Sequence, residues 1–259
     1  MWQGLIIFGA AFVAGMVNSV AGGGTLISFP VLIWLGLDPK IANVTNTVAL
    51  WPGSLGAWIG FRREIAGSGR WMAALAGPSI IGGLAGAALL LATSSRTFSV
   101  LVPYLILFAT ILFAVGDRIT RRVRPAGKEI SSEQAVSEPG RVWWIGAAVF
   151  QFFVAVYGGY FGAGIGILML AALGLLGLTD IHQMNGLKNF FAMCINLVSA
   201  FYFMLEGPVE WAEAIVMAVG AVAGGFGGAG LARRLGRNFV RRAVIFIGLA
   251  MALSLMARR

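Results

Sequence analysis

The sequence predicts an all-α integral membrane protein built from two related halves, and composition, hydropathy and an internal repeat support this prediction. Apolar residues make up 59% of the 259 residues, and charged residues make up 11%, against roughly 25% in a typical soluble domain. The mean hydropathy is +0.87, so a soluble fold could not hide the apolar surface. The alternating pattern of a membrane barrel is missing from the sequence. Helices are therefore the expected spanning elements.

Several apolar stretches have the length of a transmembrane helix, which needs about 20 residues to cross the hydrocarbon core. Residues 2–20 begin the chain without a basic segment and end without a clear small-residue cleavage site. We interpret them as a retained helix rather than a signal peptide. Four further predicted spans are 70–92, 97–116, 209–232 and 239–257.

The chain repeats its landmarks at an offset of about 140 residues, which indicates an internal duplication. A polar segment at 117–141 separates the two copies. We therefore predict an N-terminal repeat over 1–116, a linker over 117–141 and a C-terminal repeat over 142–259. The paired landmarks include 21–24 with 161–164, 43–46 with 185–189, Trp71 with Trp211, and 82–86 with 224–228.

Glycine clusters interrupt one long apolar stretch in each half. Residues 2–36 would extend about 50 Å as a single helix, which is too long for one crossing. We expect a full helix and then a short one in each half, at 2–20 and 24–36 and again at 142–161 and 164–177. This division predicts about five helical segments per half, with eight full transmembrane helices and two short, broken or re-entrant ones in total.

Loop charge indicates how the two halves face the membrane. The loop 62–70 is rich in arginine, whereas its counterpart at 203–213 is rich in glutamate. Equivalent loops of opposite charge are typical of inverted repeats under the positive-inside rule. We favour inverted repeats over the alternative, a parallel four-plus-four repeat. The predicted location is a bacterial inner membrane, with both termini outside and the linker 117–141 in the cytoplasm.

The glycine breaks are also candidate binding sites. A break exposes backbone N–H groups and the positive end of the following short helix, and this combination attracts anions. Broken helices at matching positions of two repeats are the best sequence indication of a transporter's binding site. For Gly82, Gly83, Gly86 and 224–230 we prefer close helix packing as the explanation. The candidate binding residues at the breaks are Gly22, Gly23, Gly24, Thr25, Gly162 and Gly164.

A polar cluster follows each short helix on an otherwise apolar segment. Such groups must face protein or a water-filled cavity, and their alternative role is hydrogen bonding between helices. Lys188 is the one base well inside a predicted span, and its alternative is to reach the membrane surface. Pro52 is expected to kink or break the first-half segment. The candidates are Asn43 and Asn46, Asn185, Lys188 and Asn189, with Asn18 one turn before the first break.

Other functional classes find little support in the sequence. Cys194 is the only cysteine, and we identify no metal-ligand set, nucleotide-binding loop or nucleophile with an adjacent base, so we expect no cofactor, no metal and no enzyme activity. The net charge of +9 comes from short loops beside apolar segments, where bases face lipid headgroups rather than nucleic acid. The expected partners are a small anionic solute and the lipid bilayer, and formation of a homodimer is a further possibility.

Two motifs resemble a known family. The stretch 15–30, with Asn18 and the glycine run 22–24, resembles the N-terminal signature of the TauE/SafE family of sulfite and organosulfonate exporters, as does the stretch 36–46. Residues 158–166 and 186–189 are similar to that family's second copy of the signature. The similarity covers essentially the whole chain apart from the linker. It implies transport of sulfite or a related sulfur-containing anion by a secondary carrier.

The leading hypothesis is a secondary transporter that exports a small sulfur-containing oxyanion by alternating access. The two breaks and the two polar clusters would enclose one central site, and rocking of one half against the other would expose it to each side in turn. The alternatives are an anion channel and a membrane scaffold that transports nothing.

Overall fold

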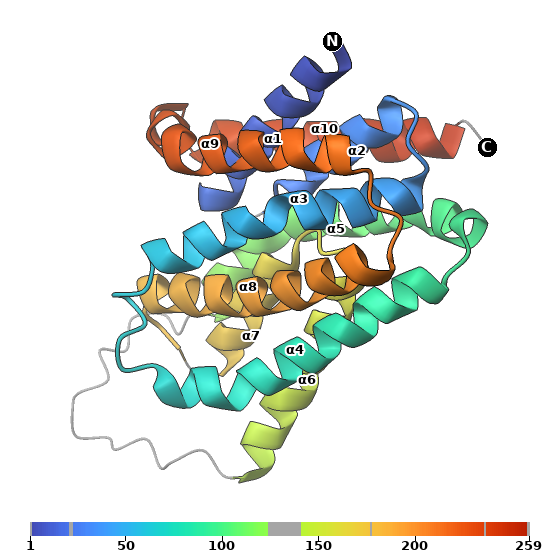
Figure 1. Cartoon of the computed structure of the whole chain (residues 1–259). Coiled ribbons are helices and arrows are strands. Elements are labelled where there is room, and N and C mark those ends of the chain that lie inside the picture. The colour runs from blue at the N-terminus through green and yellow to red at the C-terminus, as the bar shows by residue number, and fades with distance from the viewer. Residues whose placement is uncertain (1, 21–22, 124–140, 177, 236, 258–259) are drawn as a thin grey trace.

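The computed structural model describes residues 2–20, 23–123, 141–176, 178–235 and 237–257, and the predicted all-α class is confirmed for these residues. Helix α5 continues through Val123, past the predicted boundary at 116, and most of the predicted linker lies outside the described residues. Figure 1 shows the helices: α1 (Trp2–Val20), α2 (Thr25–Trp34), α3 (Pro39–Gly60), α4 (Gly69–Ala92), α5 (Ser95–Val123), α6 (Arg141–Tyr160), α7 (Ile165–Leu175), α8 (Ile181–Glu206), α9 (Trp211–Leu235) and α10 (Arg237–Ala257).

The two short helices follow the glycine breaks, as predicted, and each is shorter than expected. Helix α2 has 10 residues and α7 has 11. Helix α2 ends early because Gly36 adopts the left-handed conformation (φ 96°). The amide of Gly36 then donates to the Ile33 carbonyl and that of Leu37 to the Leu32 carbonyl. This is the Schellman arrangement, which satisfies the last carbonyls of a helix.

The helices that carry the polar clusters begin in the same way in both halves. Asp38 precedes α3, and its side chain accepts hydrogen bonds from the amides of Lys40 (2.9 Å) and Ile41 (3.3 Å). Asp180 precedes α8 and accepts from the amide of His182 at 2.8 Å. Aspartate at this position satisfies amides that no helical carbonyl can reach. Helix α3 continues through Pro52, so the break expected there does not occur.

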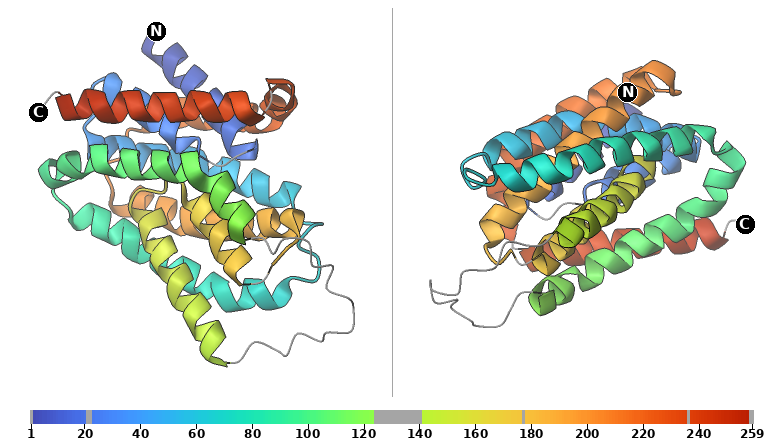
Figure 2. Two further views of the ribbon diagram at one scale, coloured as in Figure 1. Left: turned by 180° about the vertical axis from the view of Figure 1, so that it is seen from behind. Right: turned by 90° about the horizontal axis from the view of Figure 1, so that it is seen from below.

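The arrangement of helices repeats when the two halves are exchanged. Helices α9, α3, α8 and α4 lie side by side in that order on the face seen in Figure 1, and α10 and α5 pack together on the opposite face (Figure 2). Exchanging α3 with α8, α4 with α9 and α5 with α10 reproduces the same neighbours. The N-terminal ends of α1 and α6, which also correspond, project at opposite ends of the molecule (Figure 1).

The tightest packing joins helices from different halves. Helix α1 packs along α9, and α6 packs along α4. Glycine makes this approach possible, because a Cβ on Gly224 would collide with the Phe12 carbonyl oxygen and one on Gly86 with that of Val156. A Cβ on Gly82 would meet the Phe152 carbonyl oxygen at 2.5 Å. Small residues that let helix backbones approach are typical of membrane helix pairs. The packing interpretation is therefore confirmed for Gly82, Gly86 and Gly224, whereas a Cβ on Gly225 would meet nothing.

The molecule thus divides into two units that differ from the sequence halves. One unit, here the α1–α9 unit, combines α1, α2 and α3 with α9. The other, the α4–α6 unit, combines α4 with α6, α7 and α8. The units meet where α3 packs on α8, and α5 and α10 pack mainly on each other at the boundary between them. Rocking of one sequence half against the other would separate the α1–α9 and α4–α6 pairs, so the structure argues against that expected motion.

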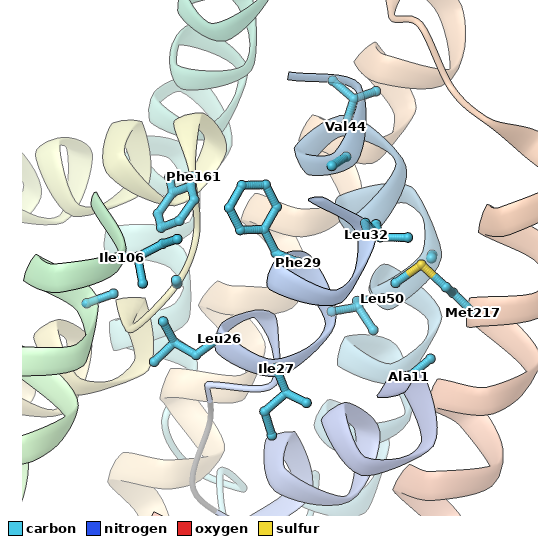
Figure 3. Close-up of a cluster of buried hydrophobic side chains, with 14 of the residues drawn as sticks. Ala11, Leu26, Ile27, Phe29, Leu32, Val44, Leu50, Ile106, Phe161 and Met217 are labelled. Carbon is cyan, nitrogen blue, oxygen red and sulfur yellow. The ribbon is translucent and has the colours of Figure 1, made fainter. Parts of the chain in front are cut away.

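The described residues form two apolar cores. One, built from Leu75, Met169 and Phe191 among others, lies almost wholly within the α4–α6 unit. The other spans both units, because it combines residues of α1, α2, α3, α9 and α10 with residues of α4, α5, α7 and α8. Figure 3 shows side chains of α2 at its centre, with Phe29 directed toward Phe161 at the second break. Their rings meet edge to face with centroids 5.3 Å apart, so the second break rests against α2.

Four described helical segments are long and apolar enough to cross a membrane: Gly69–Ala92, Ser95–Gly116, Val142–Tyr160 and Ile181–Glu206. The predicted spans at 70–92 and 97–116 are thereby confirmed. Shorter apolar stretches in α9 and α10 cover Trp211–Phe226 and Arg242–Ala257. Large apolar side chains such as Phe246 (73% exposed) cover the outside of the bundle. This outer surface suits lipid, since a soluble protein rarely exposes such a belt.

Candidate functional site

A cavity of about 90 Å³ lies between the two units, where both glycine breaks meet α3 and α8. One water needs roughly 10–15 Å³, and drug-sized ligands occupy roughly 300 Å³ or more. The cavity therefore suits a small solute with a few waters. Its walls are formed by Asn18, Gly23, Thr25, Asn46, Thr47, Leu50, Gly53, Ser54, Ala57, Gly158, Phe161, Gly162, Gly164, Ile165, Gly166, Lys188, Asn189, Ala192 and Asn196.

Most of the candidate residues predicted from the sequence line this one cavity. They come from both halves and include Asn18, Gly23, Thr25, Asn46, Gly162, Gly164, Lys188 and Asn189. Gly24, Asn43 and Asn185 are not among the lining residues, and Gly22 lies outside the described residues. The structure thus brings together positions more than a hundred residues apart in the chain.

The first break differs from the expected open anion site. The Oδ1 atom of Asn18 accepts hydrogen bonds from the amides of Gly23 (3.0 Å) and Gly24 (2.8 Å). These backbone donors are therefore already satisfied by the protein itself. Because Asn18 also lines the cavity, its Nδ2 group is the donor left for a ligand. The sequence singled out Asn18 and these glycines, but it could not show that Asn18 binds the glycine amides.

The second break has no such side-chain acceptor. The position equivalent to Asn18 is Gly158, and Gly164 caps α7 in the left-handed conformation (φ 81°) without a side-chain hydrogen bond. The Tyr157 hydroxyl holds the break by donating to the Ala163 carbonyl at 2.7 Å. Within the described residues, the amides of Gly164 and Gly166 make no hydrogen bond, and both residues line the cavity. The end of α7 is therefore open to a ligand.

Lys188 reaches this open end from α8. It is only 6% exposed, and its Nζ lies 3.3 Å from Oδ1 of Asn185. Asn185 in turn donates to the Ile181 carbonyl at 2.8 Å, so it orients Lys188 from outside the lining. A Cβ on Gly166 would lie 3.2 Å from the Lys188 side chain at Cδ. The glycine therefore makes room for the lysine against α7, and burial contradicts the alternative in which Lys188 reaches the membrane surface.

The first polar cluster forms hydrogen bonds with neighbouring helices. Ser28 donates from its hydroxyl to Oδ1 of Asn46, so the Nδ2 group of Asn46 remains to face the cavity. Asn43 is buried and donates to the Tyr160 carbonyl at 2.9 Å, which links α3 to the end of α6. The structure therefore gives Asn43 an interhelical role, which was the alternative interpretation of this cluster.

Ser54 and Asn196 are among the lining residues that were not predicted from the sequence. Asn196 on α8 donates to the hydroxyl of Ser54 on α3 at 2.9 Å, across the contact between the two units. Helical spacing in the sequence could have identified both residues. Ser54 lies on the same helix face as Asn46 and Leu50, and Asn196 lies on the same face as Lys188 and Ala192. Ser54 and Asn196 also stand at the offset that relates the other landmarks.

The chemistry of the lining favours a small anion. Among the described residues that form it, Lys188 supplies the charge, and asparagine amides supply further hydrogen-bond donors. Carboxylates are missing from this described lining. A cation would find no opposite charge on these walls, whereas an anion would meet an ammonium group, amide donors and the positive end of α7.

The profile of the sulfite exporter TauE/SafE family matches residues 7–255 of the chain. The chain belongs to this family. A curated relative from Haemophilus influenzae, described as a probable membrane transporter protein, is 27% identical over 95% of this chain and 91% of its own length. The probable membrane transporter protein YfcA of Escherichia coli K12 is 25% identical over 97% of this chain and 88% of its own. No solved structure matches the chain.

Family membership and these relatives identify the chain as a membrane transporter, and its apolar helices make it a multi-pass membrane protein. The resemblance found in the sequence motifs is thus confirmed over nearly the whole chain. The relatives are described as transporters rather than enzymes, in agreement with the missing nucleophile and base in the sequence.

Proposed function

We propose that the protein is a secondary transporter that exports a small sulfur-containing oxyanion, such as sulfite or an organosulfonate, across the bacterial inner membrane. The observation that carries this proposal is the cavity between the units, where buried Lys188 and several amides converge. Ionisable residues inside membrane spans are rare and mark substrate or ion pathways. Family membership adds the chemical class of the anion.

Transport proceeds by alternating access of the α1–α9 unit against the α4–α6 unit. The cavity lies where these units meet, so a change in their relative tilt opens it to one side and closes it to the other. The glycine-packed pairs α1–α9 and α4–α6 stay intact during this motion. The inverted orientation of the repeats, with both termini outside and the linker in the cytoplasm, supplies the two equivalent end states.

Vesicles containing the purified protein test this function directly. They should accumulate radiolabelled sulfite or taurine against unlabelled substrate in counterflow, which a carrier supports and a channel does not. Currents far faster than carrier turnover would establish an anion channel instead. A protein that neither transports nor gains thermal stability from sulfite, sulfate, taurine or sulfoacetate would be a scaffold, and the proposal would be wrong.

The same assay tests Lys188 with the variant Lys188→Met, which keeps the length of the side chain and removes its charge. A hydrogen bond to a charged group contributes roughly 1.5–3 kcal/mol, so we expect the apparent substrate affinity to fall at least ~10-fold. Transport equal to that of the parent protein would contradict the site.

Reporter fusions test the orientation. A cytoplasmic reporter in the linker and external reporters at both termini are expected. A linker and a C-terminus on the same side would exclude the inverted arrangement.

A further inference from the structure

The two glycine breaks line one cavity, yet they present different groups to it. At the first break the amide of Gly24 is bound by Asn18, and the amide of Leu26 donates to the Gly23 carbonyl at 3.0 Å. The equivalent amides at the second break belong to Gly164 and Gly166, and neither has a hydrogen-bond partner in the described part of the chain. The two halves therefore share a fold but differ in which backbone amides remain available to a ligand.

Asn189 is a second, independent sign of a ligand at the second break. It is 9% exposed, it lines the cavity, and its side-chain amide makes no hydrogen bond within the described residues. A side-chain amide offers two N–H donors, and at this position the cavity is where a ligand can meet them. The corresponding residue of the first half is Thr47, whose hydroxyl donates to the Asn43 carbonyl at 2.9 Å. Of these two equivalent side chains, only Asn189 in the second half therefore has donors that a ligand can use.

Positive charge is concentrated on the same side. Lys188 lies against Gly166 in the first turn of α7, whereas the equivalent position of the first half holds the neutral Asn46. A helix N-terminus acts as roughly half a positive charge, and the Lys188 ammonium group adds to it, so this side of the cavity attracts an anion more strongly than the other.

We infer that the site holds one anion, bound by the amides of Gly164 and Gly166, the Lys188 ammonium and the Asn189 amide. Asn18 fills the equivalent place in the first half, since its Oδ1 accepts from the backbone amides as a bound anion would. This inference rests on the proposed function for the class of anion, and it adds the position and the number of bound anions.

Titration calorimetry of sulfite into the full-length protein in lipid nanodiscs tests this inference with a pair of equivalent substitutions. The parent protein should bind about one anion. Asn189→Ala should weaken binding at least ~10-fold, because a hydrogen bond to a charged group is lost. Thr47→Ala should change affinity less than about twofold, because its hydroxyl bonds its own helix.

Equal losses in the two variants, a larger loss in Thr47→Ala, or two anions per protein would overturn the asymmetric site. If the protein transports sulfite but shows one of these patterns, the proposed function stands and the asymmetric site is wrong. If Asn189→Ala alone weakens binding but the protein does not transport sulfite, the site stands and the proposed function is wrong. If the parent protein does not bind sulfite, the site is wrong. Thermal unfolding of each variant without ligand shows whether a loss comes from misfolding.

Discussion

At the scale of single residues, Asn18 has two roles that its position before a glycine run did not distinguish. Its Oδ1 holds the amides of Gly23 and Gly24, and its Nδ2 faces the cavity. An amide is suited to this position because it accepts on one side and donates on the other. The residue that stabilises the first break is therefore also part of the wall that an anion meets.

The variant Asn18→Asp separates these two roles. A carboxylate can still accept from both backbone amides, so we expect thermal stability close to that of the parent protein. It also places a negative charge in the cavity, where unit charges a few ångströms apart interact by several kcal/mol. Sulfite affinity should fall at least ~10-fold in calorimetry. Unchanged affinity would show that Asn18 does not face the anion.

At the scale of elements, close contact between α1 and α9 and between α4 and α6 depends on glycine at particular positions. Gly224 faces the backbone of α1 at Phe12, whereas the neighbouring Gly225 has open space where a Cβ would be. The sequence predicted a packing role for the whole glycine-rich stretch, because it could not show which face of α9 meets α1. Only the crossing of the two helices distinguishes these adjacent residues.

This contrast predicts different effects for two adjacent substitutions. Gly224→Ala should destabilise the protein by about 1–3 kcal/mol, as overpacking does elsewhere, because α1 and α9 must separate. Gly225→Ala should be neutral or slightly stabilising, because alanine favours the helix and meets nothing. Thermal unfolding in detergent measures both. Similar melting temperatures for the two variants would show that α1 and α9 are not in such close contact.

At the scale of the whole molecule, the working units cross the boundary between the sequence halves. The α1–α9 unit and the α4–α6 unit each combine helices from both repeats. The cavity lies between them, with Ser54 and Asn196 joined across the contact. In the proposed transport cycle, relative motion of these units, rather than of the halves, would change access to the cavity.

Two engineered cysteine pairs test which bodies move, in a Cys194→Ser background that removes the native thiol. Ser54→Cys with Asn196→Cys joins the two units, where the side chains now share a 2.9 Å hydrogen bond. Ser79→Cys with Gln151→Cys joins α4 to α6 inside one unit, at another 2.9 Å hydrogen bond. Because asparagine and glutamine are longer than cysteine, a short, reducible bifunctional thiol reagent bridges each pair in place of a direct disulfide. Cross-linking should stop counterflow in the first variant and leave it in the second, and a reductant should restore the first.

Both pairs connect different sequence halves, so rocking of the halves predicts that cross-linking stops transport in both variants. Transport that continues when Ser54→Cys and Asn196→Cys are cross-linked would rule out motion of the two units. Comparing each variant cross-linked and reduced removes any effect of the substitutions themselves on the cavity.

The sequence by itself determined the helical membrane class, the two broken helices and eight of the residues that line the cavity, and it indicated a duplication. These properties follow from composition, hydropathy and spacing along the chain, which are local and repeat visibly. Gly23 and Gly164 could be identified in this way because they divide apolar stretches that are too long for one crossing. The family also follows from this local pattern, through motifs that cover both breaks.

Only the tertiary structure decided how the helices combine and which donors stay free. The pairing of α1 with α9 and the loss of Asn43 and Asn185 from the lining depend on helix crossings between distant segments. The hydrogen bonds of Asn18 depend on how the chain turns after α1. The two breaks look equivalent in the sequence, but they differ in the structure. The Asn18 side chain binds the amides of the first break, whereas the amides at the start of α7 remain available to a ligand.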